Sequence, residues 1–323
     1  MLKLAIGNHS SFKMLTNNLS VQVLTKSKPL ASFAKSLCGS AALQYSSDAE
    51  NERRKTIMAR GLPKRRALQG VSDIVLVASG KGGVGKSTTA VNLALAMAKQ
   101  STKSIGILDA DIYGPSIPIM MNLFDQPFVD ETGKMIPLSN YDIKCMSMGF
   151  LIRKSEDALV WRGPMVMGAV EKLAHGTNWV GTDIVVIDMP PGTGDIHLSV
   201  AQTLAVKGAI VVSTPQKIAV ADAIKAVSMF RSVNIPVIGC IENMGTFSCP
   251  NCKSEARVFG EDNNVKSIAT DLGIPFLGTI PLEPEIMRCS DAGTPVVIAH
   301  PNTITTKLYS KMGESILNFL HSV

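Results

Sequence analysis

The sequence predicts a single doubly wound α/β domain with a mostly parallel sheet, on two observations. From Asp73 onward, short β-branched runs alternate with helical patterns, which is the order of a sheet covered by helices on both faces. The runs are nearly continuously apolar, as in parallel strands buried on both sides. Hydrophobic residues make up 46% of the chain, charged residues 18% and aromatic residues 5%. This composition excludes a disordered or collagen-like protein and predicts an aliphatic core.

The expected strands are 74–78, 104–108, 184–187, 209–213, 236–241 and 276–279, and the expected helices include 87–99, 219–232, 264–272 and 303–320. The last of these helices places Leu308, Met312, Ile316, Phe319 and Leu320 on one face. Such a stripe could anchor a helix to a membrane surface, but packing onto the sheet is the more common role and is predicted here. No stretch approaches the ~18 apolar residues of a membrane-spanning helix.

The net charge of +6 is concentrated at the N-terminus. Residues 1–47 contain five Lys, many Ser, Thr and Leu, and no Asp or Glu, which predicts a mitochondrial transit peptide, with a disordered tail as the alternative. Residues 48–70 contain seven basic and three acidic residues and are interpreted as a basic lead-in. Residues 71–323 carry 20 basic and 23 acidic residues. The α/β domain is therefore not basic, and no nucleic-acid partner is expected.

A phosphate-binding loop follows the first expected strand directly. It reads Gly80-Lys81-Gly82-Gly83-Val84-Gly85-Lys86-Ser87-Thr88 and fits the pattern G-x-x-x-x-G-K-[ST]. Glycines let consecutive backbone N–H groups face a polyphosphate, and the N-terminus of the following helix adds its positive dipole end. Lys86 would reach the β- and γ-phosphates and the Ser87 hydroxyl would bind Mg²⁺. The loop predicts ATP and Mg²⁺ as ligands.

The same loop also fits the dinucleotide pattern G-x-G-x-x-G, with Asp109 at the position of a ribose-binding acid. That reading is disfavoured because a dinucleotide loop has no use for Lys86 and Ser87, or for a second acid downstream. This second acid is Asp188, which ends an apolar strand and suits Mg²⁺ held through water. The Pro-Pro-Gly run at 190–192 suits an element that senses the γ-phosphate.

Cys249 and Cys252 form a C-x-x-C motif in a loop expected after the strand that ends at Ile241. Alone, the motif fits half of a zinc site, a redox dithiol, or two incidental thiols. A [4Fe–4S] cluster or structural Zn²⁺ wants four ligands, and one pair supplies two. The other cysteines (Cys38, Cys145, Cys240 and Cys289) do not obviously complete a site. Two chains related by a two-fold axis would supply four thiolates.

These motifs resemble a known family. Lys81 matches the extra lysine of the deviant Walker A (SIMIBI-type) P-loop NTPases, which include partition, septum-site and nitrogenase-iron proteins. The segments 109–116 (DADIYGPS), 188–195 (DMPPGTGD) and 242–244 (ENM) resemble the Mrp-like branch. With the lead-in RGLP at 60–63 and the targeting-like N-terminus, residues 57–320 are most similar to the mitochondrial nucleotide-binding-protein-like iron–sulfur carriers of the NUBPL or Ind type.

The resemblance implies roles for several residues of the nucleotide site. Lys81 would reach across a nucleotide-sandwich homodimer to the partner's phosphates. Asp111 would orient the attacking water, and Asp109 would help to hold the metal water. Asn243 would contact the adenine edge, with a turn residue as the alternative, and the backbone near Pro281 would line the same pocket.

For the cysteine pair, the resemblance implies a labile [4Fe–4S] cluster bridged by Cys249 and Cys252 of two subunits. The sequence thus predicts an ATP-dependent iron–sulfur carrier and weak ATPase of the mitochondrial matrix, which delivers clusters to apoproteins, with respiratory complex I assembly as the implied destination. The alternatives are a partition- or septum-type switch ATPase with zinc or no metal at the C-x-x-C, and a subunit of a metal-ion or oxyanion pump. A membrane surface, bound peripherally, is a further candidate partner.

Overall fold

The computed structural model describes residues 65–249, 251–252, 254–260 and 264–322, apart from 152–162. The predicted transit peptide at 1–47, Cys38 and most of the predicted lead-in at 48–70 therefore lie outside the described residues. The compact unit that contains the described residues falls within residues 63–323. Arg66 forms a β-bridge with Leu204, and Leu68 is buried in the core. The last residues of the predicted lead-in thus already pack against the α/β domain.

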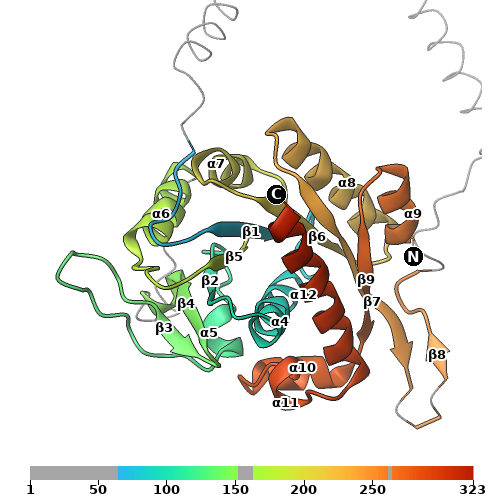
Figure 1. Cartoon of the computed structure of the whole chain (residues 1–323). Coiled ribbons are helices and arrows are strands. Elements are labelled where there is room, and N and C mark those ends of the chain that lie inside the picture. Colours follow the sequence, from blue (N-terminus) through green and yellow to red (C-terminus); the bar gives the residue numbers. More distant parts are fainter. Residues whose placement is uncertain (1–64, 152–162, 250, 253, 261–263, 323) are drawn as a thin grey trace, which may run out of the picture. The chain divides into compact units, whose positions relative to one another are not determined.

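A single nine-stranded, mostly parallel sheet organises this unit, which confirms the predicted fold class. The strand order is β3-β4-β2-β5-β1-β6-β7-β8, with β9 also paired to β7 (Figure 1). Among the strands that the structure describes, the β3–β4 and β7–β8 pairs are antiparallel and the other pairs are parallel. The strands are β1 Asp73–Ala78, β2 Ile105–Asp109, β3 Leu138–Asn140, β4 Ile143–Ser147, β5 Ile184–Asp188, β6 Gly208–Ser213, β7 Val237–Ser248, β8 Glu255–Ala256 and β9 Phe276–Leu282.

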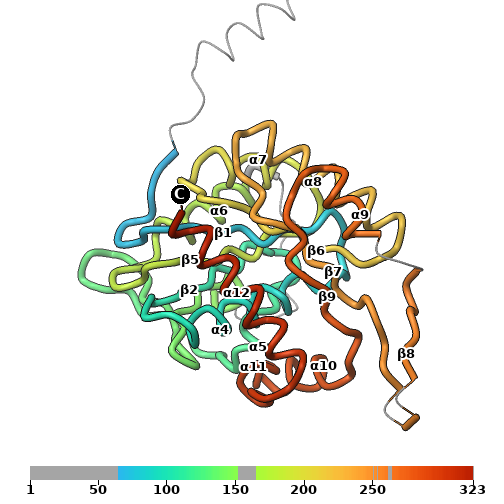
Figure 2. The backbone as a smooth tube through the Cα atoms, turned by 45° about the vertical axis from the view of Figure 1, so that its right-hand side comes forward, coloured from blue at the N-terminus to red at the C-terminus, as the bar shows by residue number. Residues whose placement is uncertain are grey.

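Helices cover both faces of the sheet, as in a doubly wound fold. They are α4 Lys86–Gln100, α5 Ile117–Met120, α6 Gly163–Gly176, α7 Asp195–Thr203, α8 Lys217–Ser232, α9 Asn264–Asp271, α10 Pro284–Asp291, α11 Val296–Ala299 and α12 Ile304–Ser322. Helices α4 and α12 pack against each other on one face, and α6 to α9 lie on the other (Figures 1 and 2). Strands β1, β5 and β6 are buried between these layers, so their apolar runs form the core.

The C-terminal helix α12 belongs to the core, as predicted. Met312, Ile316 and Leu320 are buried, and Leu308 and Phe319 pack against the same cluster. Since the apolar stripe is covered by the protein itself, it is not available as a membrane-surface anchor. None of the described helices is long and apolar enough to span a bilayer.

Strand β7 is longer than the sequence predicts. The expected strand ends at Ile241, whereas β7 continues to Ser248. Beyond Ile241 it pairs with β9, through Asn243 with Ile280, and then with β8, through Phe247 with Ala256. The C-x-x-C motif therefore lies in the turn of the β7–β8 hairpin, not in a loop that directly follows residue 241.

Candidate functional site

The phosphate loop joins β1 to α4 at the carboxyl edge of the sheet. This is where ligands bind in doubly wound folds, because neighbouring connections run to opposite faces and leave a crevice. Gly83 and Gly85 have φ of 78° and 81°, a left-handed conformation that favours glycine. Gly85 is also the N-cap of α4. A β-carbon at Gly85 would overlap Nδ2 of Asn243, so both conformation and space require glycine there.

The loop forms one wall of a cavity of about 520 Å³, a size typical of small-molecule sites. The predicted residues that line it are Lys81, Gly82, Gly83, Gly85, Lys86, Ser87, Thr88, Asp111, Asn243 and Pro281. Gly80 and Val84 do not line the cavity. Gly80 lies against the backbone of Asp222 in α8, and the Val84 side chain is buried. Most of the residues predicted from separate motifs thus meet around one space.

Lys86 is held by carboxylates at the ends of the central strands. Its Nζ lies 2.6 Å from Oδ1 of Asp188 and 4.0 Å from Oδ2 of Asp111, and it donates to Oγ of Ser87 at 3.1 Å. Asp188 ends β5 and is directly opposite Asp109, which ends β2. Both carboxyl groups are buried. One lysine therefore provides the positive charge for a cluster of three acids, Asp109, Asp111 and Asp188.

Burial, and then the nearby Asp188 carboxylate, raises the pKa of Asp109 to about 8, although Ser147 Oγ and the Ile117 backbone N–H both donate to it. Burial also raises the pKa of Asp188 and of Asp111, and in both cases Lys86 opposes the shift. The cluster is thus short of positive charge.

The second oxygen of Asp188, Oδ2, is buried and has no hydrogen-bond partner among the described residues. Together with the Ser87 hydroxyl it offers the hard oxygen donors that Mg²⁺ prefers. These residues therefore fit the predicted cation. Asp109 and Asp188 do not line the cavity itself, which suits contact through water.

Asn243 and Lys81 differ in how far the structure defines them. Asn243 lies within β7, not in a turn, and its Nδ2 donates to the backbone oxygen of Val84 at 2.8 Å. It therefore ties β7 to the phosphate loop while it lines the cavity. Lys81 is exposed at the cavity rim. Its reach to a partner subunit and the adenine contact of Asn243 stay predictions.

The cysteine pair lies at the end of the β7–β8 hairpin, which extends away from the helices of the unit (Figure 1). Cys252 is exposed and Cys249 half-buried. Sγ of Cys252 lies 3.0 Å from Oγ of Ser254, and hydrogen bonding from Ser254 lowers the pKa of Cys252 to about 7. A large share of this thiol is thus ionised at neutral pH, and the thiolate is the metal-binding form. Cys145, Cys240 and Cys289 are buried.

Comparisons with known proteins agree with this combination of sites. The profile of the ParA-type family described as NUBPL iron-transfer P-loop NTPase matches residues 70–317. The chain belongs to this family. Over 286 residues it is 50% identical to "Iron-sulfur cluster transfer protein NUBPL" of Mus musculus, covering 88% of this chain and 89% of the mouse protein.

Two further relatives of this NUBPL-type chain extend the comparison. "Iron-sulfur protein required for NADH dehydrogenase, mitochondrial" of Arabidopsis thaliana is 49% identical, with 81% of this chain and 83% of the plant protein covered. Among solved structures, a nucleotide-binding protein from Archaeoglobus fulgidus in complex with ADP superposes with a TM-score of 0.63 at 34% identity. That match covers 74% of this chain and 93% of the archaeal chain.

The sequence alone did not point to one wall of the NUBPL-type cavity. Met244, Leu282 and Glu283 line it beside Asn243 and Pro281, and α5 and α10 close it with Ile119, Met120, Ile286, Met287, Ser290 and Asp291. Helices α5 and α10 are short and were not among the expected elements. The signal that could have found α10 is Pro284 after an acidic N-cap position, because proline is common in the first turn of a helix.

Proposed function

We propose that this protein is an ATP-dependent iron–sulfur carrier. In this proposal a homodimer holds a [4Fe–4S] cluster as cargo between the Cys249 and Cys252 pairs of two chains and delivers it to apoproteins. The observation that carries the proposal is the exposed C-x-x-C on a hairpin, with the pKa of Cys252 lowered to about 7. A cysteine pair at the surface, one of whose thiols is readily ionised, suits ligands that must later release their cargo.

The nucleotide site supplies the switch in this proposal. Lys86 is bound to Asp188 at 2.6 Å, and the β- and γ-phosphates of ATP would compete with that carboxylate for its ammonium group. Release of Asp188 would leave its oxygens to hold Mg²⁺ through water, and Mg²⁺ would neutralise charge on the phosphates. Asp111, which lines the cavity, would orient the attacking water. Slow hydrolysis suits a switch more than a metabolic enzyme.

Strand β7 links the two sites. Asn243 in its middle donates to Val84 of the phosphate loop, and the same strand ends at Ser248, next to Cys249. A shift of the loop on nucleotide binding would act on β7 through this hydrogen bond. We propose that the ATP state changes the placement of the cysteine hairpin in this way, and with it the release of the cluster.

The compartment and the clients rest on the relatives and on the N-terminal composition. Relatives at 49–50% identity carry the names iron–sulfur cluster transfer protein, and iron–sulfur protein required for NADH dehydrogenase, mitochondrial. Residues 1–47 have the composition of a transit peptide. We propose the mitochondrial matrix as the compartment and apoproteins of respiratory complex I as clients.

Anaerobic purification of the full chain, with iron, sulfide and zinc counted per chain, tests the proposal. We expect about two iron and two sulfide per chain, since one [4Fe–4S] cluster would be shared by two chains. Cys249→Ser or Cys252→Ser should abolish the cluster and leave ATP binding unchanged. Asn251→Ala is the matched control, because it alters an exposed residue between the cysteines and keeps both cysteines.

Other outcomes would overturn the carrier role. A cluster that survives either cysteine substitution contradicts bridging ligation. Zinc that is lost together with these cysteines, with no sulfide, would make them a structural clamp. If the protein held neither iron nor sulfide, even after reconstitution, a partition- or septum-type switch ATPase would be the favoured function.

A further inference from the structure

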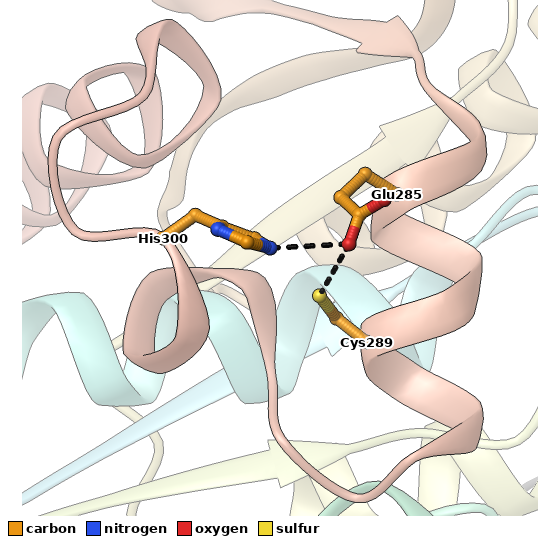
Figure 3. A group of neighbouring side chains, drawn as sticks. All are labelled: Glu285, Cys289 and His300. Carbon is orange, nitrogen blue, oxygen red and sulfur yellow. Dashed lines mark hydrogen bonds and ion pairs between the residues drawn. The ribbon is translucent and has the colours of Figure 1, made fainter.

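Three side chains of metal-ligating type converge where α10 meets the end of α11 (Figure 3). Glu285 and Cys289 come from α10, and His300 follows α11 directly. Their ligand atoms all lie within 4.8 Å of one another. Nε2 of His300 is 3.1 Å from Oε1 of Glu285, and Sγ of Cys289 is 3.6 Å from the same oxygen. None of these residues belongs to the phosphate loop or to the C-x-x-C motif.

We propose that Glu285, Cys289 and His300 bind one divalent transition-metal ion of the Zn²⁺ class. A thiolate, an imidazole and a carboxylate are the ligand types of zinc sites. With zinc–ligand bonds of 2.0–2.3 Å, neighbouring ligands of a tetrahedral ion lie roughly 3.3–3.8 Å apart. The separations of 3.1 and 3.6 Å are close to that range, so small side-chain movements are enough to take up an ion.

The backbone already fixes the positions from which the three ligand side chains extend. Glu285 and Cys289 are four residues apart on α10, which places them on the same face of the helix. The His300 N–H donates to the oxygen of Val296 at 2.9 Å, and the His300 oxygen accepts from Oγ1 of Thr306 at 2.7 Å. An ion would therefore have to order only the side chains, and not the backbone that carries them.

Cys289 differs from an ordinary core cysteine. A buried thiol usually behaves as a small apolar side chain, but Sγ of Cys289 is directed at a carboxylate oxygen. The residue is only 4% exposed, whereas the Glu285 and His300 side chains are 45% and 42% exposed. An ion can therefore enter from the solvent side and keep a water as its fourth ligand. Arg288 contacts the other oxygen of Glu285, at 3.4 Å, which leaves Oε1 for the metal.

Helix α10 also connects the proposed metal site to the nucleotide cavity. The residues of α10 that line the nucleotide cavity, among them Ile286, Met287 and Ser290, are fixed to the same helix. A bound ion would therefore hold one wall of the cavity in place.

The experiment is a Co²⁺ titration of the full chain carrying Cys249→Ser and Cys252→Ser, reduced and free of nucleotide. These substitutions remove the two thiols of the hairpin and make the readout independent of the proposed cluster site. We expect one Co²⁺ per chain, with visible d–d bands and a thiolate-to-cobalt charge-transfer band that Zn²⁺ abolishes. Zn²⁺ should also raise the melting temperature, because it binds the folded chain.

Single substitutions in that background decide between the site and adventitious binding. Cys289→Ser should remove the charge-transfer band, and His300→Ala and Glu285→Gln should each weaken binding at least about tenfold. His321→Ala and Glu314→Gln are matched controls at exposed positions of α12 and should change nothing. If Cys289→Ser lost the band because it failed to fold, the half-buried His300 would be the deciding position. Equal affinity in His300→Ala, a band that persists in Cys289→Ser, or no cobalt binding would overturn the proposal.

Discussion

The phosphate loop and the cysteine hairpin are opposite kinds of site on one sheet. The loop lies between β1 and α4 at the centre of the sheet. Lys86 and the nearby carboxylates of Asp109, Asp111 and Asp188 are buried. The hairpin lies at the edge, where β8 has only two residues, both exposed. The pKa of Asp109 is raised to about 8 by burial, whereas that of Cys252 is lowered to about 7 by hydrogen bonding from Ser254. Desolvation governs the first site and local hydrogen bonds govern the second.

This difference matches the chemistry proposed for each site. Stabilising charge on a polyphosphate needs fixed donors in a place with little water, and the core of the sheet provides it. Handing a cluster to another protein needs ligands that a partner can reach. A protein that did both at one place would have to open its core at each transfer. Here a single strand, β7, carries Asn243 at the loop and ends beside Cys249, so the sites stay connected but separate.

The largest expected effect is on nucleotide binding by Lys86→Ala. Lys86 provides the charge that is expected to contact two phosphates, and each charged hydrogen bond contributes about 1.5–3 kcal/mol. We therefore expect ATP affinity, measured by calorimetry, to fall about 100-fold or more. Lys311→Ala is the matched control and should leave ATP affinity unchanged, because Lys311 is exposed on α12 and does not line the cavity. If Lys86→Ala bound ATP as well as the unchanged chain, the cavity would not be a phosphate site.

The next effect compares two glycines of the same loop. Gly83 and Gly85 have nearly equal positive φ, but a β-carbon at Gly83 meets nothing within 4 Å, whereas one at Gly85 overlaps Asn243. Gly83→Ala should cost only the conformational strain of about 1 kcal/mol. Gly85→Ala should lower the free energy of unfolding by about 2–3 kcal/mol, because it also displaces the amide that binds Val84. Urea denaturation measures both, and equal losses would mean that the Asn243 contact is unimportant.

The two regions also differ in how well their sequence predicts them. The loop is a contiguous motif next to a strongly apolar strand, so its ligand and position follow from the sequence, and the structure gathers most of the predicted residues around one cavity. The hairpin was expected as a loop because the polar Glu242 and Asn243 and then Gly245 interrupt the apolar run of β7. Pairing with β9 and β8 extends the strand through these residues. Such long-range pairing overrides local pattern and is invisible in one sequence.

Contacts between distant segments were unpredictable for the same reason. Nothing in the sequence states that Asn243 would donate to Val84, 159 residues away. The sequence gives no partner for Cys289. Glu285 lies near it only because α10 is a helix, and His300 only because the chain turns back after α11. Helix α6 and strands β3 and β4 were also unexpected. Gly and Pro in α6 and Lys144 in β4 interrupt the apolar pattern, and β3 is only three residues long, two of them polar.

The smallest effect concerns the hydrogen bond that distinguishes the hairpin. Ser254→Ala removes the hydroxyl that lies 3.0 Å from Sγ of Cys252, so the pKa of Cys252 should rise from about 7 toward the ordinary value of 9.0. Alkylation of this residue, followed against pH by peptide mass spectrometry, should then reach half its maximal rate at a higher pH and be several-fold slower at pH 7. Ser248→Ala, on the same exposed hairpin, is the control.

Because Cys252 and Ser254 are at the surface, Ser254→Ala should change the free energy of unfolding by less than about 0.5 kcal/mol. An unchanged midpoint would mean that Ser254 does not set the reactivity of this thiol. If adding ATP to the unchanged chain moved the pH midpoint of Cys252 alkylation, the nucleotide site and the hairpin would be coupled. Cys252 does not line the cavity. If the shift passes along β7, it should disappear in Asn243→Ala, which lacks the hydrogen bond to Val84.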